Sequence, residues 1–294
     1  MIITRLNGGL GNQMFQYAFG KSLAENLQTP LKLDLSVFAT PLGSSPDTPR
    51  TYELNRWNTH AEIATQTEIQ RFAPLREGKT SFIQRLFKHS SDLVYYKEKR
   101  FRFDAGAFQL QGAVYLDGYW QSEKYFADHA DSIRTAFTPL AALHGLNKEL
   151  AFEMADTCSV SIHVRRSDYQ KDKTTLDFHG LCPLAYYKDA VALLRQKYKH
   201  IHLYVFSDDQ QWSAENIQFD IPTTHIVHNR GAESYLDLWL MSRCKHHVLA
   251  NSSFSWWGAW LNENPLKTVI APRRWFAGTV PDTSDLIPAS WTCL

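Results

Sequence analysis

The sequence predicts an α/β protein with two doubly wound parallel sheets. Short apolar segments typical of buried strands alternate with longer segments whose apolar residues recur at helical spacing, first at the amino terminus and again after Cys158. Parallel neighbours in one sheet need a crossover of this kind, in most cases a helix. We therefore expect two α/β halves, residues 1–150 and residues 151–294, with a ligand cleft between them.

The first half opens as a βαβ unit whose turn is rich in glycine. Its expected elements are a strand at 2–6, a helix at 13–28, strands at 31–35 and 113–119, and a helix that starts near Ser122. Residues 40–112 show no clear periodicity and begin with an exposed loop of Pro, Ser and Gly.

The second half repeats the alternation more regularly. The expected strands are 159–164, 202–206, 224–227, 247–250 and 268–271, and the expected helices are 183–198, 233–244 and 255–262. Polar residues follow several of these strands, and ligands bind at the carboxyl ends of strands in open α/β sheets. The candidate binding residues should therefore gather at one edge of this sheet.

Composition excludes several classes of protein. The 31 basic and 30 acidic residues nearly cancel, so no overall field would attract nucleic acid. We expect no signal peptide, and no apolar run reaches the ~20 residues that a spanning helix needs. The four cysteines form no C-x-x-C pair, which indicates reduced thiols in a cytoplasmic protein, with peripheral contact to the inner membrane still open. We interpret His246 and His247 as polarity at a surface or sheet edge, since adjacent strand residues face opposite ways and cannot easily share a metal.

The strongest motif is His163-Val164-Arg165-Arg166-Ser167-Asp168, which starts on a strand and carries two guanidinium groups past its end. Arginine offers a planar fork of donors that suits diphosphate oxygens, and it can take the place of a metal ion. Alternation along the strand places His163 and Arg165 on one side. We expect Arg165 to face the ligand and Arg166 to form a structural ion pair, for example with Asp168.

The segment Asn7-Gly8-Gly9-Leu10-Gly11-Asn12-Gln13 lies between the first strand and the first helix. Its glycines would let the backbone approach a ligand, and the helix start offers N–H groups to a phosphate. It is neither a P-loop nor a dinucleotide fingerprint, because Met14 stands where the third glycine belongs. A simple tight turn is the structural alternative.

Two further strand ends carry candidate ligand groups. Asp208 and Asp209 could hold ribose hydroxyls or a guanine edge, while helix capping is the structural alternative and a metal site the less favoured one. The segment Asn251-Ser252-Ser253-Phe254 leads into a helix, and its hydroxyl and amide groups could cradle an anion. Trp256, Trp257 and Trp260 are expected in the core and not as a sugar platform.

These four segments together resemble the bacterial and animal α1,2-fucosyltransferase family, known as glycosyltransferase family 11. The segment from Tyr115 to Phe126 resembles the bacterial members most closely, and the resemblance extends from Arg5 to Phe276. It implies a GT-B fold, two Rossmann-like domains that face a central cleft. The carboxyl-terminal domain would bind GDP-β-L-fucose and the amino-terminal domain would serve the acceptor.

The resemblance also implies an inverting transfer of L-fucose to the 2-hydroxyl of a terminal galactose on an oligosaccharide or glycolipid-linked glycan, with no metal or other cofactor. In similar enzymes, the first arginine of the motif that here spans His163 to Asp168 contacts the donor diphosphate, and this arginine is Arg165. The resemblance also implies that Asn12 lies near the reacting groups. The remaining donor-binding residues that we carry over or infer are Gly9, Gly11, His163, Asp208, Asp209, Ser252, Ser253 and Phe254.

The base that takes the acceptor proton is the least determined part of the site. Asp168 is the first candidate because it follows the arginines, and Asp34, Asp117 and Glu123 are alternatives in the other half. Two other functions compete with fucosyl transfer: a carbohydrate-binding protein without catalysis, and a transferase for another GDP-sugar or for an acceptor such as a chitooligosaccharide or peptide. The oligomeric state has no signal in the sequence.

Overall fold

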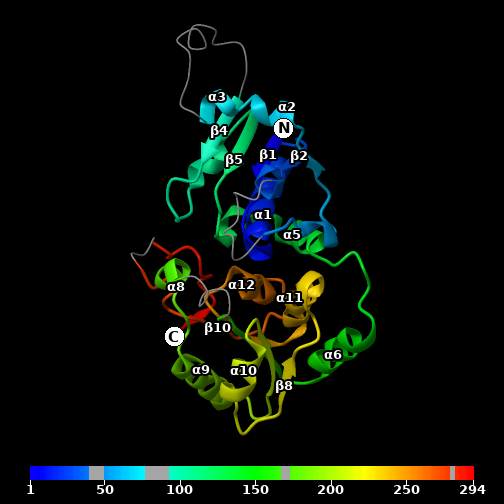
Figure 1. Cartoon of the computed structure of the whole chain (residues 1–294), viewed down its shortest axis with the longest axis vertical. Helices are drawn as coiled ribbons and strands as arrows, with labels where there is room; N and C mark the ends of the chain where they lie inside the picture. Colours follow the sequence, from blue (N-terminus) through cyan, green and yellow to red (C-terminus); the bar gives the residue numbers. More distant parts are fainter. Residues whose placement is uncertain (40–49, 77–92, 167–172, 279–281) are drawn as a thin grey trace. The chain divides into compact units, whose positions relative to one another are not determined.

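The computed structural model describes residues 1–39, 50–76, 93–166, 173–278 and 282–294, and the chain forms two compact units (Figure 1). Unit 1 comprises Met1–Thr138 and Pro281–Leu286, and unit 2 comprises Pro139–Val280 and Ile287–Leu294. The boundary that we expected at residue 150 would fall inside helix α6 (Gly145–Asp156). Leu150 and Met154 of that helix pack in the core of unit 2, which is why the chain divides before it.

Unit 1 contains a five-stranded parallel sheet in the order β3-β2-β1-β5-β4. Its strands are β1 (Ile2–Arg5), β2 (Leu31–Asp34), β3 (Glu62–Ile63), β4 (Leu93–Lys97) and β5 (Ala113–Asp117). Its helices are α1 (Leu10–Asn26), α2 (Gln66–Gln70), α3 (Ala73–Arg76) and α5 (Ala130–Ala136), and 3₁₀ turns lie at Ser36–Ala39, Leu54–Arg56, Ala105–Gln109, Glu123–Tyr125 and Ala127–His129. The predicted βαβ opening is confirmed.

The α-helix that we expected from Ser122 is wrong. Ser122 does cap a helical turn by accepting the Lys124 N–H, but that turn is a 3₁₀ helix of three residues. Tyr125 and Phe126 are both fully buried, and side chains that face the core at adjacent positions do not fit one face of a longer helix. The α-helix of this region begins later, at Ala130.

Unit 2 contains a six-stranded parallel sheet in the order β11-β10-β9-β6-β7-β8. Its strands are β6 (Ser159–Val164), β7 (His202–Ser207), β8 (Thr223–Ile226), β9 (His246–Val248), β10 (Val269–Ala271) and β11 (Thr292–Cys293). Besides α6, its helices are α8 (Lys173–His179), α9 (Leu184–Lys197), α10 (Gln210–Asn216), α11 (Tyr235–Arg243) and α12 (Ser253–Trp260), with a 3₁₀ turn at Gly231–Glu233.

Both faces of this second sheet are covered by helices. On β7, Leu203 and Val205 pack in one core with residues of α9, whereas Tyr204 and Phe206 pack in another core with α6 and α11. Successive strand residues point to opposite faces, so two separate cores on one strand require helices on both sides. Figure 1 shows α9 and α6 on opposite sides of the sheet. The doubly wound fold is confirmed for this unit.

Our interpretation of the histidine pair is wrong. His246 and His247 are both buried, because β9 is an inner strand of the sheet between β6 and β10. His247 lies between the Ser161 hydroxyl, 2.8 Å from its Nδ1, and the Asn262 amide, 2.7 Å from its Nε2. Both ring nitrogens of His247 are therefore paired inside the protein, and the His246 Nδ1 accepts the Thr268 N–H at 3.0 Å.

The tryptophans of α12 are core residues, as expected. Trp256 and Trp257 are fully buried and Trp260 is 4% exposed. All four cysteines are free thiols. Among the described residues, no helix has both the length and the hydropathy to cross a membrane.

Candidate active site residues

Two neighbouring strands of unit 2 bring the arginine and aspartate motifs together. β6 and β7 are parallel and in register, with His163 opposite Phe206 and Val164 opposite Ser207, so Arg165 and Asp208 follow at the same sheet edge. The Arg165 Nε lies 3.4 Å from the Asp208 Oδ2. The other oxygen of Asp208 accepts the backbone N–H of Arg166 at 2.8 Å. Asp208 thus fixes both the backbone and the guanidinium of the arginine loop.

Arg166 and Asp209 have structural contacts that explain their positions. The Arg166 guanidinium lies 3.8 Å from the ring centre of Trp212 on α10 and 3.7 Å from Asp209. Asp209 caps α10 by accepting the Trp212 N–H at 3.1 Å. The capping alternative therefore applies to Asp209, and the ion pair that we expected for Arg166 is made with Asp209. Ser167 and Asp168 lie outside the described residues.

The serine segment reaches the same edge through β9, which pairs with β6 in parallel. Ser252 is the N-cap of α12, and its hydroxyl accepts the Phe254 N–H at 3.3 Å. Ser253 starts the helix, and the Phe254 ring lies 5.6 Å from the buried His163 ring. This contact places the start of α12 beside the end of β6, on the side of the strand that His163 shares with Arg165.

Asn251, the first residue of this candidate segment, holds the turn before α12 through its own side chain. Its amide donates to the carbonyl of His179 at 2.8 Å and to that of Trp275 at 3.1 Å. The turn is therefore fixed to two other segments of unit 2. The strand ends of β6, β7 and β9 together present a guanidinium, a carboxylate and the amides of a helix start, a combination suited to a nucleoside diphosphate.

In unit 1, the glycine segment forms a tight turn that presents Asn12. Gly8 has a φ of +76°, and Gly9 is the N-cap of α1, so the helix starts earlier than predicted and Gly11 lies buried in its first turn. The Asn12 Oδ1 accepts a hydrogen bond of 2.7 Å from Gln121. A Cβ on Gly8 would lie 2.7 Å from the Asn12 amide nitrogen. The backbone turn at Gly8 and the hydrogen bond from Gln121 together fix the Asn12 side chain.

Two polar residues beside this loop were not predicted from the sequence to belong to the site. Gln121 orients Asn12, and Arg50 lies against Gly9, where an added Cβ would be 3.4 Å from its Nη1. Gln121 belongs to the segment from Tyr115 to Phe126 that carries the family resemblance, and this was an available signal. Arg50 follows a stretch without periodicity, and nothing in the sequence indicated its position.

Two of the three alternative bases of unit 1 have partners at the carboxyl edge of its sheet, and the third, Glu123, lies in the 3₁₀ turn after Ser122. Asp34 is fully buried, accepts the Tyr115 hydroxyl and accepts the Ser36 N–H at 2.8 Å. Asp117 accepts from the Arg5 guanidinium at 3.1 Å and from the Tyr95 hydroxyl. These carboxylates fasten strand ends to one another, which favours a structural role for both.

A buried polar network supports the loop after β8, next to the edge that carries Asp208. The Asn229 amide donates to Asp237 at 2.7 Å and to Asn147 at 2.9 Å, and Asn147 donates back to Asn229 at 2.9 Å. Burial raises the pKa of Asp237 to about 7, and the hydrogen bond from Asn229 opposes this shift only in part. Asp237 thus titrates near neutral pH inside the folded protein.

Substitution Asp237→Asn should remove a pH dependence of stability. The pKa of Asp237 rises from 3.8 to about 7 on folding, so its protonated form favours the native state below pH 4 and this stabilisation is lost as pH rises towards 7. Between pH 5 and pH 8, we expect the free energy of unfolding of wild type to fall by ~2 kcal/mol relative to the variant. Urea unfolding at several pH values measures this.

The control for this experiment is Asp220→Asn, which removes an exposed carboxylate of the same unit. The control should follow the wild-type profile. A difference between wild type and Asp237→Asn that stays constant over this pH range would contradict the shifted titration.

The doubly wound sheet of unit 2, with Arg165 and the capped start of α12 at one edge, is typical of nucleotide-binding α/β proteins. The family model described as glycosyl transferase family 11 matches residues 81–292. Similar proteins include an alpha-1,2-colitosyltransferase of Escherichia coli, 35% identical over 99% of this chain and 98% of that protein. The O-antigen biosynthesis glycosyltransferase WbnK of Escherichia coli is 34% identical over 97% of this chain and 98% of that protein. The chain belongs to glycosyltransferase family 11, and the family prediction is confirmed.

The fold is also similar to that of a solved fucosyltransferase structure. A point mutant of Arabidopsis thaliana FUT1 in complex with GDP matches with a TM-score of 0.54 and 13% identity, over 99% of this chain and 75% of that one. This likeness confirms the Rossmann-like α/β fold class predicted from the sequence.

Proposed function

We propose that this glycosyltransferase transfers L-fucose from GDP-β-L-fucose to the 2-hydroxyl of a terminal β-galactose, with inversion at the sugar. The observation that carries the proposal is Arg165 at the end of β6, fixed by Asp208 and close to the start of α12. A guanidinium and helix-start amides are complementary to a diphosphate. The 1,2 linkage in the name of the colitosyltransferase relative supports the same class of reaction.

In the proposed reaction, charge develops in opposite senses on the two products of bond cleavage. The departing fucose gains positive charge and the GDP oxygen gains negative charge, so a fixed cation at the diphosphate stabilises the transition state more than the ground state. Arg165 takes this role, assisted by the hydroxyls of Ser252 and Ser253 at the start of α12, a turn that the Phe254 N–H holds through its bond to Ser252. Asp208, Asp209 and His163 would lie towards the nucleoside.

The glycine turn of unit 1 would serve the reacting groups. Asn12, oriented by Gln121, can hydrogen-bond either the donor sugar or the acceptor hydroxyl. Gly9, at the N-cap of α1, leaves room for a phosphate, whereas Gly11 is buried in the first turn of the helix. The pairing of Asp34 and Asp117 leaves Asp168 and Glu123 as candidate bases, and we propose Asp168 because it follows the arginines in the sequence.

The four free thiols support a cytoplasmic location, with peripheral membrane contact compatible.

Colitose is a second candidate for the transferred sugar, because a relative of 35% identity carries it in its name. Colitose is L-fucose without the 3-hydroxyl, so the two donors share the GDP moiety and the site chemistry above. Purified protein should be offered GDP-fucose, GDP-colitose and GDP-mannose with lactose as acceptor, and the product linkage read by NMR. Transfer of fucose to the galactose 2-hydroxyl is the expected result. Turnover with GDP-mannose alone, or product at another hydroxyl, would overturn the proposal.

The proposed mechanism needs no divalent metal, since the arginine supplies the positive charge. We expect kcat/KM to change by less than about twofold when EDTA replaces added magnesium or manganese. Initial rates with GDP-fucose in the two buffers measure this. A rate that collapses in EDTA and returns with either metal would contradict the assignment of Arg165 as the sole cation at the diphosphate.

A further inference from the structure

Unit 1 contains a cavity beside the ends of β4 and β5 that none of the motifs above explains. Its volume is about 390 Å³, within the range of small-molecule sites. The wall is formed by Tyr96, Glu98, Trp120 and Tyr125, and Lys99 and Arg100 stand at its exposed side. The cavity therefore combines an aromatic wall with both acceptor and donor groups.

The aromatic wall is held rigidly. The Tyr96 ring stacks on Trp120 at 5.7 Å and 12°, and the Tyr125 ring meets Trp120 edge-on at 5.5 Å and 82°. Trp120 has a φ of +56°, a conformation that a bulky residue adopts only when its surroundings impose it. Strain of this kind is concentrated at functional sites.

Glu98 imposes that conformation. Its carboxylate accepts the backbone N–H groups of Tyr119 at 2.7 Å and of Trp120 at 3.2 Å. Gly118 is required beside it, because an added Cβ would lie 2.4 Å from the Glu98 Cβ. Each carboxylate oxygen still has a lone pair for a further donor.

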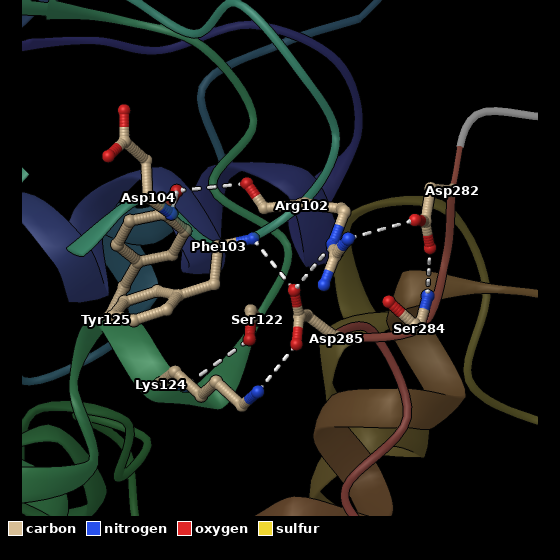
Figure 2. Close-up of polar contacts among 9 residues, drawn as sticks. All are labelled: Arg102, Phe103, Asp104, Ser122, Lys124, Tyr125, Asp282, Ser284 and Asp285. Atoms are coloured by element: carbon tan, nitrogen blue, oxygen red, sulfur yellow. Dashed lines mark hydrogen bonds and ion pairs between the residues drawn. The ribbon is translucent and has the colours of Figure 1, made fainter. Parts of the chain in front are cut away.

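A second set of polar contacts holds residues of the lining, and Figure 2 shows those that Asp104 and Arg102 make with Tyr125 and Asp285. The Asp104 N–H donates to the Tyr125 hydroxyl at 2.9 Å, and the Tyr96 hydroxyl donates to the Asp104 carboxylate. Asp285 lies between Arg102 and Lys124, with its oxygens 3.5 Å and 2.5 Å from their nitrogens. Asp282 and Asp285 together balance the charges of Arg102 and Lys124. The remaining charges of the lining, the carboxylates of Glu98 and Asp104 and the cations Lys99 and Arg100, cancel one another, so the lining suits a neutral polyhydroxyl ligand that needs both acceptors and donors.

The cavity is connected to the glycine turn through adjacent residues. Trp120 lines the cavity, and the next residue, Gln121, donates to Asn12 at 2.7 Å. Trp120 also packs on Phe19 of α1, with ring centres 4.9 Å apart. A ligand in the cavity would therefore contact the same rigid segment that orients Asn12.

We infer that this cavity binds a sugar residue of the acceptor, the one to which the terminal galactose is attached; this inference rests on the proposed function. The C–H face of a pyranose packs against the exposed part of the Tyr96 ring. Its hydroxyls donate to Glu98 and Asp104 and accept from Arg100. The cavity would thus select the second sugar of the acceptor, a choice that the donor site in unit 2 does not make.

The test compares acceptors that have or lack the second sugar. The probes are lactose and galactosyl-β1,3-N-acetylgalactosamine against methyl β-D-galactoside. The measured quantity is the ratio of kcat/KM for the better disaccharide to kcat/KM for the methyl glycoside. This ratio should fall roughly tenfold in Tyr96→Ala and in Arg100→Ala, because each variant loses one contact to the second sugar. Arg100 is exposed, so its variant keeps the fold if Tyr96→Ala does not. Phe152→Ala, which removes an aromatic ring that is 67% exposed in unit 2, is the control and should keep the wild-type preference.

A binding measurement separates failure of this inference from failure of the proposed function. Calorimetric titration of the same disaccharides without any donor should show affinity in wild type and roughly tenfold weaker affinity in both cavity variants. A protein that transfers no fucose but shows this loss would refute fucosyl transfer and retain the sugar subsite. Equal affinity for disaccharide and methyl glycoside, or variants that bind as wild type does, would overturn the subsite.

Discussion

Replacing Arg165 with alanine should lower kcat for fucosyl transfer by about 10³-fold or more and leave the fold intact. Removal of one preorganised group that faces developing charge costs about 10²–10³-fold in other enzymes, and a full cation at a diphosphate should contribute at least as much. Arg165 retains 22% exposure of its side chain and fills no apolar core, so the melting temperature should change little. Steady-state kinetics with GDP-fucose and thermal unfolding measure the two effects.

Arg166→Ala is the matched control, since both arginines lie in the same loop and pair with adjacent aspartates. Arg166 stacks on Trp212, so its loss should destabilise the protein by about 1 kcal/mol and reduce kcat far less than the Arg165 change. Arg165→Lys keeps the charge and loses the planar fork, and it should recover only part of the rate. Equal kinetic losses in the two alanine variants would contradict the division of roles between the arginines.

In the second half of the chain, the five expected strands and three expected helices are all present, whereas α6, α8, α10 and β11 were not predicted. Its four inner strands, β6, β7, β9 and β10, are short and largely buried, as the burial of every residue of β6 illustrates. Such strands stand out from the polar loops that follow them. Because parallel strands end at one edge, the position of Arg165 next to Asp208 followed from the topology.

The first half was less predictable because its elements are short and its site depends on contacts between distant residues. β3 has two residues and both are exposed, so it leaves no hydrophobic pattern. Glu98 acts through backbone N–H groups 21 and 22 residues further along the chain. Gln121 reaches Asn12 over 109 residues. Local periodicity carries no information about pairings of this kind.

The histidine pair illustrates the opposite error, in which polarity was taken as a sign of exposure. His247 is fully buried because Ser161 and Asn262 satisfy both of its ring nitrogens. Buried polar groups are common when their hydrogen bonds are made inside the protein. The partners come from β6 and from the end of α12, and only the fold brings them together.

Gly8→Ala should lower kcat by about 10²-fold, although it changes no group proposed to touch the substrate. The φ of +76° at Gly8 costs an alanine about 1–2 kcal/mol, and the new Cβ would lie 2.7 Å from the Asn12 amide nitrogen. Asn12 must then move and weaken its hydrogen bond to Gln121. A displacement of about 1 Å near reacting groups can cost 10²-fold in rate. GDP affinity should change much less than kcat, since Arg165 and its partners belong to unit 2.

Gly145→Ala separates the backbone effect from the displacement of Asn12. Gly145 also has a positive φ, +52°, but no atom lies within 4 Å of the position of its added Cβ. Both variants should lose comparable stability in urea unfolding, and only Gly8→Ala should lose rate. Asn12→Ala combined with Gly8→Ala should be no slower than Asn12→Ala alone, because the glycine acts through that side chain. Full activity in Gly8→Ala would contradict the role that we propose for Asn12 near the reacting groups.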